Sequence, residues 1–208
     1  MKGRRDMLTW EIEDGFRDEN LQVLCGCDEA GRGPLAGPVY AAAVILPRGI
    51  TIEMLDDSKK LSPKKRDLLY DIIKEKALCY AVARAEVEEI EEINILSAAL
   101  LAMRRAVEQL EIKPDGALID GNIARGFSIP AFPVIGGDAK CPSIAAASIL
   151  AKVERDRDCM ELDKQYPEYG FAIHKGYATK LHREMILKHG PCPAHRRSFL
   201  KKLLGETT

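Results

Sequence analysis

Four acidic residues of this chain stand at places where carboxylates can hold a metal ion. Asp28 and Glu29 close one apolar run, and Asp120 and Asp138 follow two later ones. A carboxylate at the end of a buried strand loses hydration unless a cation or hydrogen-bond donors replace the water. The residue types therefore predict that something positive lies beside them.

The chemistry of these donors narrows the kind of metal. Carboxylate oxygens without histidine or cysteine favour Mg²⁺ or Mn²⁺ over Zn²⁺. Four carboxylates in one crevice repel strongly unless divalent cations neutralise them, and two such ions can activate a water and stabilise the leaving oxygen in phosphodiester hydrolysis. Singly, two of the acids have ordinary explanations, because Asp120-Gly121-Asn122 suits a turn and Asp138 suits the cap of a following helix.

The elements that must position these acids alternate between strands and helices, which is typical of an α/β fold. A glycine-proline turn between the first two strands predicts a hairpin-like pair, and Ser62-Pro63 is typical of a helix start. Strand ends in α/β sheets converge on one crevice where ligands bind, so the acids are expected to meet there. Strands are expected over 21–28, 39–46, 78–87, 117–120 and 131–135, and helices over 63–76, 93–110, 142–165, 178–188 and 195–204.

Length and composition favour one domain over residues 1–208, with an N-terminal extension over about 1–18 and a basic helical segment over about 171–208. The 208 residues, 46% of them hydrophobic, suffice for a substantial core. Six cysteines without a CxxC pair favour reduced structural thiols over a zinc site. Residues 1–6 lack an apolar run behind their charges, and no stretch approaches the ~18 apolar residues of a membrane span. We therefore expect a cytoplasmic protein without membrane contact.

The charge of the chain is nearly balanced, at −1 overall, so contact with a polyanion must come from a local patch. The C-terminal segment offers such a patch, although a pair of solvated helices would explain it equally well. Its basic residues, opposed only by Glu184 and Glu206, are Lys175, Lys180, Arg183, Lys188, Arg196, Arg197, Lys201 and Lys202.

A dinucleotide-binding loop is an alternative for the glycines after the first acids. Residues 31–36 fit the pattern G-x-G-x-x-[G/A], and Glu53 lies at a suitable distance to hold a ribose. That fold needs a helix directly after the glycines, whereas 39–46, bounded by Pro38 and Pro47, is typical of a strand. We therefore set this alternative aside.

The stretch from Cys27 to Val39, CDEAGRGPLAGPV, resembles the opening signature of ribonuclease HII, the type 2 ribonucleases H. Further blocks resemble that family in the same order, and the ending 190–199 is similar to its bacterial branch. These blocks are residues 57–62, 119–122, 137–140, 143–156 and 174–177.

The resemblance implies a ribonuclease H-like fold, a mixed central sheet flanked by helices with a helical C-terminal segment. It also implies an endonuclease that hydrolyses the RNA strand of RNA–DNA hybrids and incises 5′ of single ribonucleotides in duplex DNA, leaving 3′-hydroxyl and 5′-phosphate ends. Asp28, Glu29, Asp120 and Asp138 would be catalytic and would hold two Mg²⁺ or Mn²⁺ ions, Asp28 bridging them. Asp138 would help hold the ion that activates water, with Glu29 and Asp120 on the leaving-group side.

The resemblance also implies a way to recognise one ribose, whose general handle is its 2′-hydroxyl. The loop of Gly31, Arg32 and Gly33 would read that hydroxyl with the help of Tyr177. Phosphate contacts are expected from Lys60, Lys140 and Lys175, and Lys59 is the hardest to separate from an ordinary surface lysine. We expect RNA–DNA hybrid and ribonucleotide-containing duplex DNA as partners, a monomer, and no organic cofactor. A type 1-like enzyme that needs a ribonucleotide run and a non-catalytic hybrid-binding relative remain the alternatives.

Overall fold

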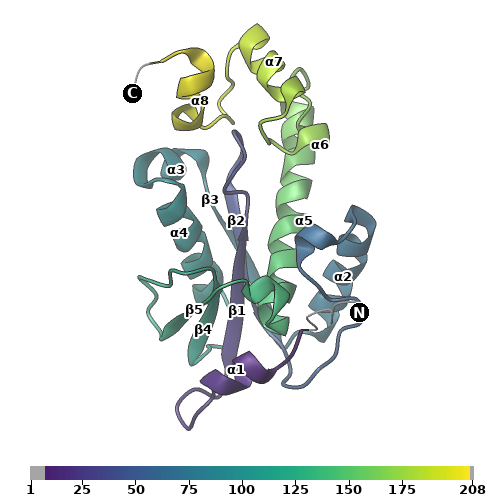
Figure 1. Cartoon of the computed structure of the whole chain (residues 1–208), viewed down its shortest axis with the longest axis vertical. Coiled ribbons are helices and arrows are strands. Elements are labelled where there is room, and N and C mark those ends of the chain that lie inside the picture. Colours follow the sequence, from purple (N-terminus) through teal and green to yellow (C-terminus); the bar gives the residue numbers. More distant parts are fainter. Residues whose placement is uncertain (1–7, 207–208) are drawn as a thin grey trace, which may run out of the picture.

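The computed structural model describes residues 8–206, which form a five-stranded mixed sheet with helices on both faces (Figure 1). The strand order is β3-β2-β1-β4-β5. β1 pairs antiparallel with β2 and parallel with β4, and β5 continues the parallel half. The strands are β1 (Leu24–Ala30), β2 (Val39–Ile45), β3 (Cys79–Ala85), β4 (Gly116–Asp120) and β5 (Ala131–Val134).

Helices follow the strands along the chain and then form the C-terminal part. They are α1 (Glu11–Phe16), the 3-10 turn η1 (Ser58–Lys60), α2 (Pro63–Lys76), α3 (Val87–Ile93), α4 (Ile95–Glu108), the 3-10 turn η2 (Gly137–Ala139), α5 (Pro142–Gln165), α6 (Phe171–His174), α7 (Lys180–His189) and α8 (Arg197–Leu204).

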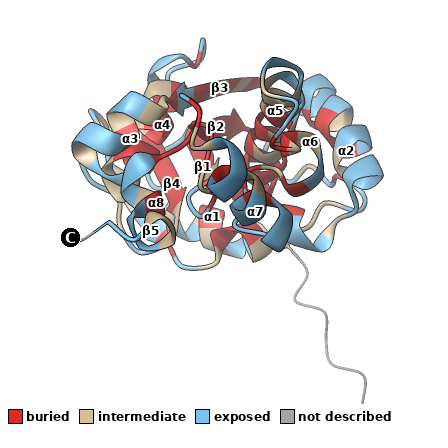
Figure 2. Ribbon diagram, turned by 90° about the horizontal axis from the view of Figure 1, so that it is seen from above, coloured by how far each residue is buried: buried red, intermediate tan, exposed pale blue. Residues whose placement is uncertain are grey.

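The two faces of the sheet are covered by different helices because neighbouring side chains of a strand point to opposite sides. On β2, Ala41 and Ala43 pack with buried residues of α4, whereas Ala42 and Val44 pack with α2 and α5. Alanine on both faces lets the helices approach the sheet closely. Figure 2 shows the result, with buried residues concentrated along the strands and α5 and exposed residues on the outer helices.

Helix α5 is the longest element and joins the sheet to the C-terminal helices (Figure 1). Its start lies against β1 at Gly26, where a Cβ atom would stand only 2.4 Å from the backbone nitrogen of Ile144. The backbone N–H and the hydroxyl of Ser143 both donate to the buried carboxylate of Glu13, at 2.9 and 2.8 Å. The N-terminus of α5 is thus held by the sheet on one side and by α1 on the other.

Most predicted elements are confirmed within one to three residues at their ends. The hairpin-like pair is the antiparallel β1 and β2, and Ser62 caps α2 as expected. The alternative explanation of Asp138 as the cap of the following helix does not hold, because Asp138 lies in η2 and the Glu13 carboxylate accepts from the backbone N–H of Ser143 at the start of α5. The last predicted helix starts two residues later than expected, at Arg197. The N-terminal extension carries α1, and its residues 1–7 lie outside the described part.

All six cysteines are free and buried, in agreement with structural thiols. Within residues 8–206, no helix has both the length and the apolar character needed to cross a membrane.

Candidate metal centre and substrate-binding loop

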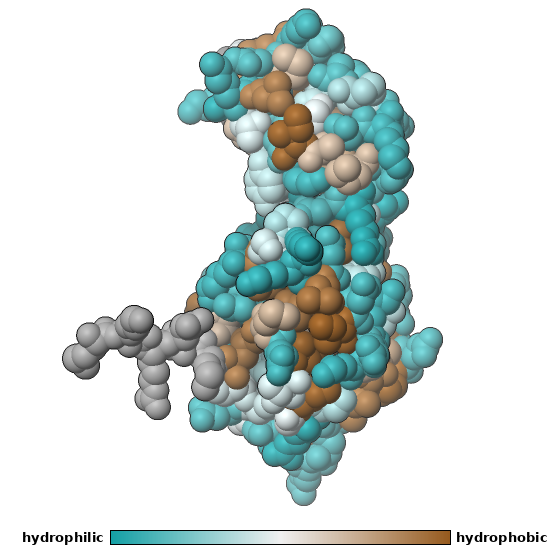
Figure 3. All heavy atoms as spheres, turned by 90° about the vertical axis from the view of Figure 1, so that its right-hand side faces the viewer, coloured by the Kyte–Doolittle hydropathy of each residue, from teal (hydrophilic) through white to brown (hydrophobic). Residues whose placement is uncertain are grey.

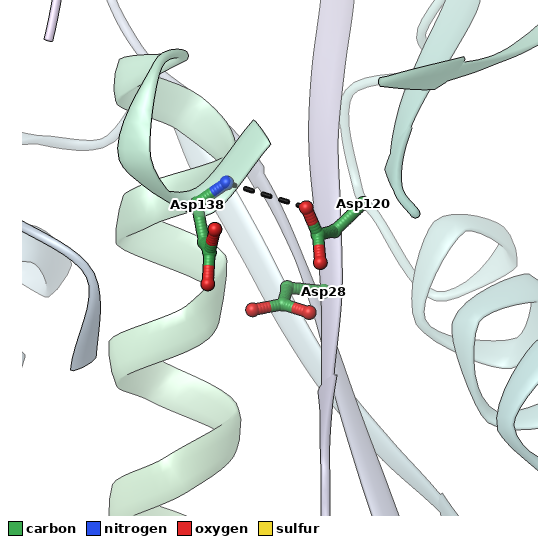
Figure 4. Close-up of side chains that lie close together, drawn as sticks. All are labelled: Asp28, Asp120 and Asp138. Carbon is green, nitrogen blue, oxygen red and sulfur yellow. Dashed lines mark hydrogen bonds between the residues drawn. The ribbon is translucent and has the colours of Figure 1, made fainter. Parts of the chain in front are cut away.

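Three of the four predicted acids converge at one edge of the sheet (Figure 4). β1 and β4 run parallel with Cys27 beside Ile119, so Asp28 and Asp120 follow at neighbouring positions. η2 brings Asp138 to the same place from the end of β5. One oxygen of each carboxylate lies within 4.8 Å of the others. The expectation that strand ends converge on one crevice therefore holds for residues that are up to 110 positions apart in the chain.

Main-chain donors orient Asp120 within this group. Its Oδ1 accepts hydrogen bonds from the backbone N–H of Gly137 at 2.7 Å and of Asp138 at 3.3 Å. The close approach depends on Gly137, where a Cβ atom would stand 2.5 Å from Cδ1 of Ile144. The Asp120 carboxylate thus ties the end of β4 to η2 and leaves Oδ2 available to a ligand.

Burial and mutual repulsion disfavour the simultaneous ionisation of the three carboxylates. Burial, with the charges of Glu29 and Asp120, holds the pKa of Asp28 well above its ordinary value. Burial and the charge of Asp138 raise the pKa of Asp120 despite its two backbone donors. A divalent cation bound among the carboxylates reverses this penalty, because its positive charge stabilises the ionised forms that burial disfavours.

Lys59 supplies part of the missing positive charge. Its Nζ lies 3.0 Å from Oδ2 of Asp138, although 73% of the side chain remains exposed. Burial lowers the pKa of Lys59, but the hydrogen bond to Asp138 and the charges of Asp138 and Asp28 outweigh it and raise the pKa overall. A single exposed ammonium balances only one of the three carboxylates.

Glu29 lies outside the group of three. It follows Asp28 on β1, and consecutive side chains of a strand leave on opposite faces. Its Oε1 is 3.3 Å from Nη1 of Arg32. Burial raises the pKa of Glu29, an effect that the charge of Arg32 opposes. The four expected ligands thus form a set of three with the fourth turned to the glycine loop.

The donor set fits a hard divalent cation. Three carboxylates offer oxygen ligands only, Asp28 is 3% exposed, and within residues 8–206 this is the one acidic, cysteine or histidine group of such closeness. Oxygen ligands of this kind suit Mg²⁺ and Mn²⁺. The residues present therefore support the expected class of metal.

The loop from Gly31 to Gly33 directly follows β1 and meets the segment that carries Tyr177. A Cβ atom on Gly33 would lie 3.8 Å from Cε1 of Tyr177, and the N–H of Leu35 donates to the carbonyl of Gly176 at 2.8 Å. Tyr177 is 44% exposed, so its ring and hydroxyl can reach a ligand. The structure thus places Tyr177 beside the glycine loop, with which it was expected to act.

Of the predicted phosphate-binding lysines, Lys60 and Lys140 are exposed and Lys175 is half-buried, and the three lie in different places. Nζ of Lys60 pairs with Asp56 at 3.1 Å, and Nζ of Lys140 donates to the carbonyl of Ile135 at 2.6 Å. Lys175 lies beside Tyr177 in the left-handed backbone region, at φ 52°. Of the lysines considered, Lys59 is the one that contacts the acidic group.

One member of the expected basic patch does not reach the surface. Arg196 is 0% exposed and donates to main-chain carbonyls of the glycine loop, so its assignment to a surface patch is wrong. Apart from Lys175, which follows α6, the remaining basic residues lie on α7 and α8, in the upper part of the molecule in Figure 1. Figure 3 shows a hollow with a largely hydrophilic surface between an upper part and the broader lower part.

Comparison with known proteins decides the family. A family model described as ribonuclease HII matches residues 25–202. The ribonuclease HII of Polaromonas sp. is 54% identical over 199 residues, or 96% of each chain. The chain belongs to the ribonuclease HII family. Membership makes it a ribonuclease H endonuclease, a hydrolase of nucleic acid. The ribonuclease HII of Caldicellulosiruptor saccharolyticus is 51% identical over 98% of this chain and 100% of its own.

Solved structures agree with this assignment. The ribonuclease H2 of Pyrococcus horikoshii has a TM-score of 0.71 at 27% identity, over 88% of this chain and 97% of that one. A ribonuclease HII of Archaeoglobus fulgidus, solved in complex with PCNA, has a TM-score of 0.69 at 26% identity, over 84% and 93%. Bst ribonuclease HIII, solved with Mn²⁺, has a TM-score of 0.71 at 19% identity, over 89% of this chain and 70% of that one, which supports the fold alone. The ribonuclease H-like fold predicted for this ribonuclease HII family member is therefore confirmed.

Sequence reasoning missed the burial of two arginines beside the loop and of one acid at the start of α5. Arg155 and Arg196 lie under the glycines, and Glu13 holds the start of α5. Both arginines stand inside or next to blocks that resemble the family. The sequence carries no signal that marks Arg155 as buried, because Lys152, Glu154 and Asp156 in the same block are charged as well.

Proposed function

We propose that this ribonuclease HII family member hydrolyses the RNA strand of RNA–DNA hybrids and cuts 5′ of single ribonucleotides embedded in duplex DNA. The products would carry a 3′-hydroxyl and a 5′-phosphate, and the cut would begin ribonucleotide excision repair. The observation that carries the proposal is that one turn of chain joins the acids to the glycine loop. Arg32 pairs with Glu29, and a Cβ atom on Gly33 of the same loop would lie 3.8 Å from Cε1 of Tyr177.

The metal centre would be formed by Asp28, Asp120 and Asp138, with Glu29 as the fourth carboxylate. When bound, Mg²⁺ or Mn²⁺ ions supply an activated water and stabilise the leaving oxygen. Asp120 would keep its orientation through the backbone donors at 137 and 138. Because Glu29 is held by Arg32, we propose that a substrate phosphate that engages Arg32 frees the Glu29 carboxylate from this pair.

Recognition of one ribose would come from the exposed residues Arg32, Gly33 and Tyr177. Glycine permits close approach of main-chain polar groups, and tyrosine adds a stacking face with a hydroxyl. Lys59 and Lys175 lie beside the acids and the tyrosine, which supports them as phosphate contacts. Lys60 and Lys140 would contact phosphates of the duplex that lie farther from the acidic group. Extensive contacts of α5 with the sheet and with α6 support a single catalytic domain.

Cleavage of three labelled duplexes tests the proposal. They contain one ribonucleotide, a full RNA strand, or DNA only, and each is incubated with Mg²⁺ or Mn²⁺. We expect a single cut 5′ of the ribonucleotide, extendable by a DNA polymerase from its 3′-hydroxyl, and no cut in DNA. Asp138→Asn should lose roughly 10²-fold or more in rate, the scale on which one group that stabilises transition-state charge acts.

Matched controls decide between the alternatives. Asp71→Asn changes an exposed acid on the outer face of α2 and should retain the wild-type rate. Cleavage of the full RNA strand without cleavage at one ribonucleotide would show a type 1-like requirement. Binding of hybrid without any cleavage would show a non-catalytic protein and refute the proposal.

A further inference from the structure

Arg196 is a charged side chain with no access to solvent, and its guanidinium is used entirely on main-chain oxygens. It is 0% exposed and donates five hydrogen bonds of 2.7–3.0 Å. The acceptors are the carbonyls of Gly31, Arg32, Pro34 and Gly37. Hydrogen bonds from an ionised donor are stronger than neutral ones, and the planar fork of arginine fixes their directions. Arg196 therefore sets the path of the loop.

The path of the loop decides where its donors point. In a trans peptide unit the C=O and N–H groups point to opposite sides, and the described residues contain no cis peptide bond. The carbonyls of Gly31 and Arg32 face the buried guanidinium, so the N–H groups of Arg32 and Gly33 face away from it. Both residues are exposed, and within 8–206 neither N–H donates a hydrogen bond. Two free main-chain donors are thus presented beside Glu29.

Arg155, a second buried arginine, links this loop to Tyr177. It is 1% exposed, its Nη2 donates to the carbonyl of Lys175 at 2.8 Å, and its Cζ lies 5.6 Å from the ring centroid of Tyr177. A Cβ atom on Gly31, whose φ is 105°, would stand 2.3 Å from Nε of Arg155. Glycine at this position thus allows both the backbone turn and the passage of the arginine.

We propose that Arg196 is a positioning residue for substrate selection, which holds the N–H groups of Arg32 and Gly33 in the orientation that reads a ribonucleotide in duplex DNA. The inference rests on the proposed function of the glycine loop. Arg196 touches no substrate, because it is fully buried behind the loop. It acts by fixing the orientation of the peptide units that contact the substrate.

Arg196→Lys tests this role because it keeps the positive charge but cannot bond four carbonyls in one plane. The readout is the ratio of two dissociation constants, for all-DNA duplex and for duplex with one ribonucleotide, measured with Mg²⁺ in an Asp138→Asn background that prevents cutting. A merely structural loss lowers the active fraction and leaves this ratio unchanged. We expect the ratio to fall roughly 10- to 100-fold, as for other small misplacements of positioning groups. Arg157→Lys, at an exposed site of α5, is the matched control and should keep the ratio.

The outcomes separate this inference from the proposed function. A protein with the Asp138→Asn background alone that binds both duplexes equally would refute the proposed recognition role. If that protein discriminates and the Arg196→Lys protein discriminates equally, the proposed function stands and the positioning role of Arg196 is refuted.

A measurement without a substitution at Arg196 covers the case in which Arg196→Lys does not fold. Hydrogen exchange of the side-chain Nε–H of Arg196, followed by ¹⁵N NMR in the wild-type protein, should be strongly slowed relative to Arg157. Addition of the one-ribonucleotide duplex to the Asp138→Asn protein should shift the amide signals of Arg32 and Gly33. Exchange at Arg196 as fast as at Arg157, or unmoved amide signals, would overturn the inference.

Discussion

Removal of one charge from the acidic centre should stabilise the metal-free protein while it abolishes activity. In Asp28→Asn the buried carboxylate becomes a neutral amide of nearly the same shape. Asp28 is 3% exposed and has an oxygen within 4.8 Å of oxygens on Asp120 and Asp138. Folding of the wild type must bring these charges together, whereas folding of the variant need not.

The size of the effect follows from these distances. Two unit charges 4.8 Å apart repel by about 3 kcal/mol at an effective dielectric constant of 20, and by about 1 kcal/mol in bulk water. The nearby Lys59 reduces the repulsion, so we expect Asp28→Asn to unfold with about 1 to 3 kcal/mol more free energy at pH 8 in EDTA. The pKa of Asp28 is raised in the folded state, so the unfavourable charge is present above that pKa and disappears as the pH falls. The advantage of the variant should therefore shrink toward pH 5.

Bound metal should reverse the order of stability of the wild type and Asp28→Asn. A ligand that binds only the folded state stabilises it by about 2.7 kcal/mol at 100 times its dissociation constant. Mg²⁺ or Mn²⁺ should raise the free energy of unfolding of the wild type and change that of Asp28→Asn much less. Urea denaturation followed by circular dichroism, with EDTA and with each metal, measures both effects.

Two results would refute this reasoning. A variant less stable than the wild type in EDTA at pH 8 would show that repulsion at Asp28 does not oppose folding. An equal gain from metal in both proteins would show that Asp28 does not hold it. Asp71→Asn, an exposed acid on α2, is the control for removal of one negative charge and should respond to metal like the wild type.

Two further predictions concern buried groups outside the metal centre. Glu13→Ala removes the acceptor of the Ser143 N–H and should lower the free energy of unfolding in urea by about 1 to 3 kcal/mol, because a buried donor is left unpaired. The control Glu11→Ala, on the exposed side of α1, should lower it far less. Equal losses in the two variants would contradict the capping role of Glu13. Burial lowers the pKa of His182, which shares a 3.0 Å contact with His195, from 6.5 to about 4. Its stabilising contribution is therefore complete above pH 6.5 and is lost, by up to about 3 kcal/mol, as the pH falls toward 4. His182→Gln should have a flatter dependence of unfolding free energy on pH across this range, and parallel profiles would contradict the prediction.

The fold was largely predictable because its signals are local. Apolar runs of strand length, the Ser62-Pro63 start of α2 and the small residues of α5 each report on a few neighbours in the chain. The acceptor at the start of α5 could not be predicted from such local signals, because it is the carboxylate of Glu13, which is 130 positions away from Ser143.

The candidate site was predictable in its membership but less so in its arrangement. Asp28, Asp120 and Asp138 could be grouped because parallel strands end at one edge of a sheet. The pairing of Glu29 with Arg32 could not be derived, because it depends on the path of the loop that follows β1. The contact of Lys59 with Asp138 depends on how η1 packs and has no signal in the spacing of residues.

The sequence by itself determined the family, the acids and the glycine loop, because these depend on residue types in a fixed local order. Only the tertiary structure decided which charges are buried and what they hold. Arg196 belongs by composition to a basic surface segment, yet the bridge between Ala36 and His195 draws it beneath the glycine loop. Burial depends on which segments pack together in the folded chain. An arginine is solvated where no other segment covers it, and it must donate hydrogen bonds to carbonyl oxygens where another segment packs over it.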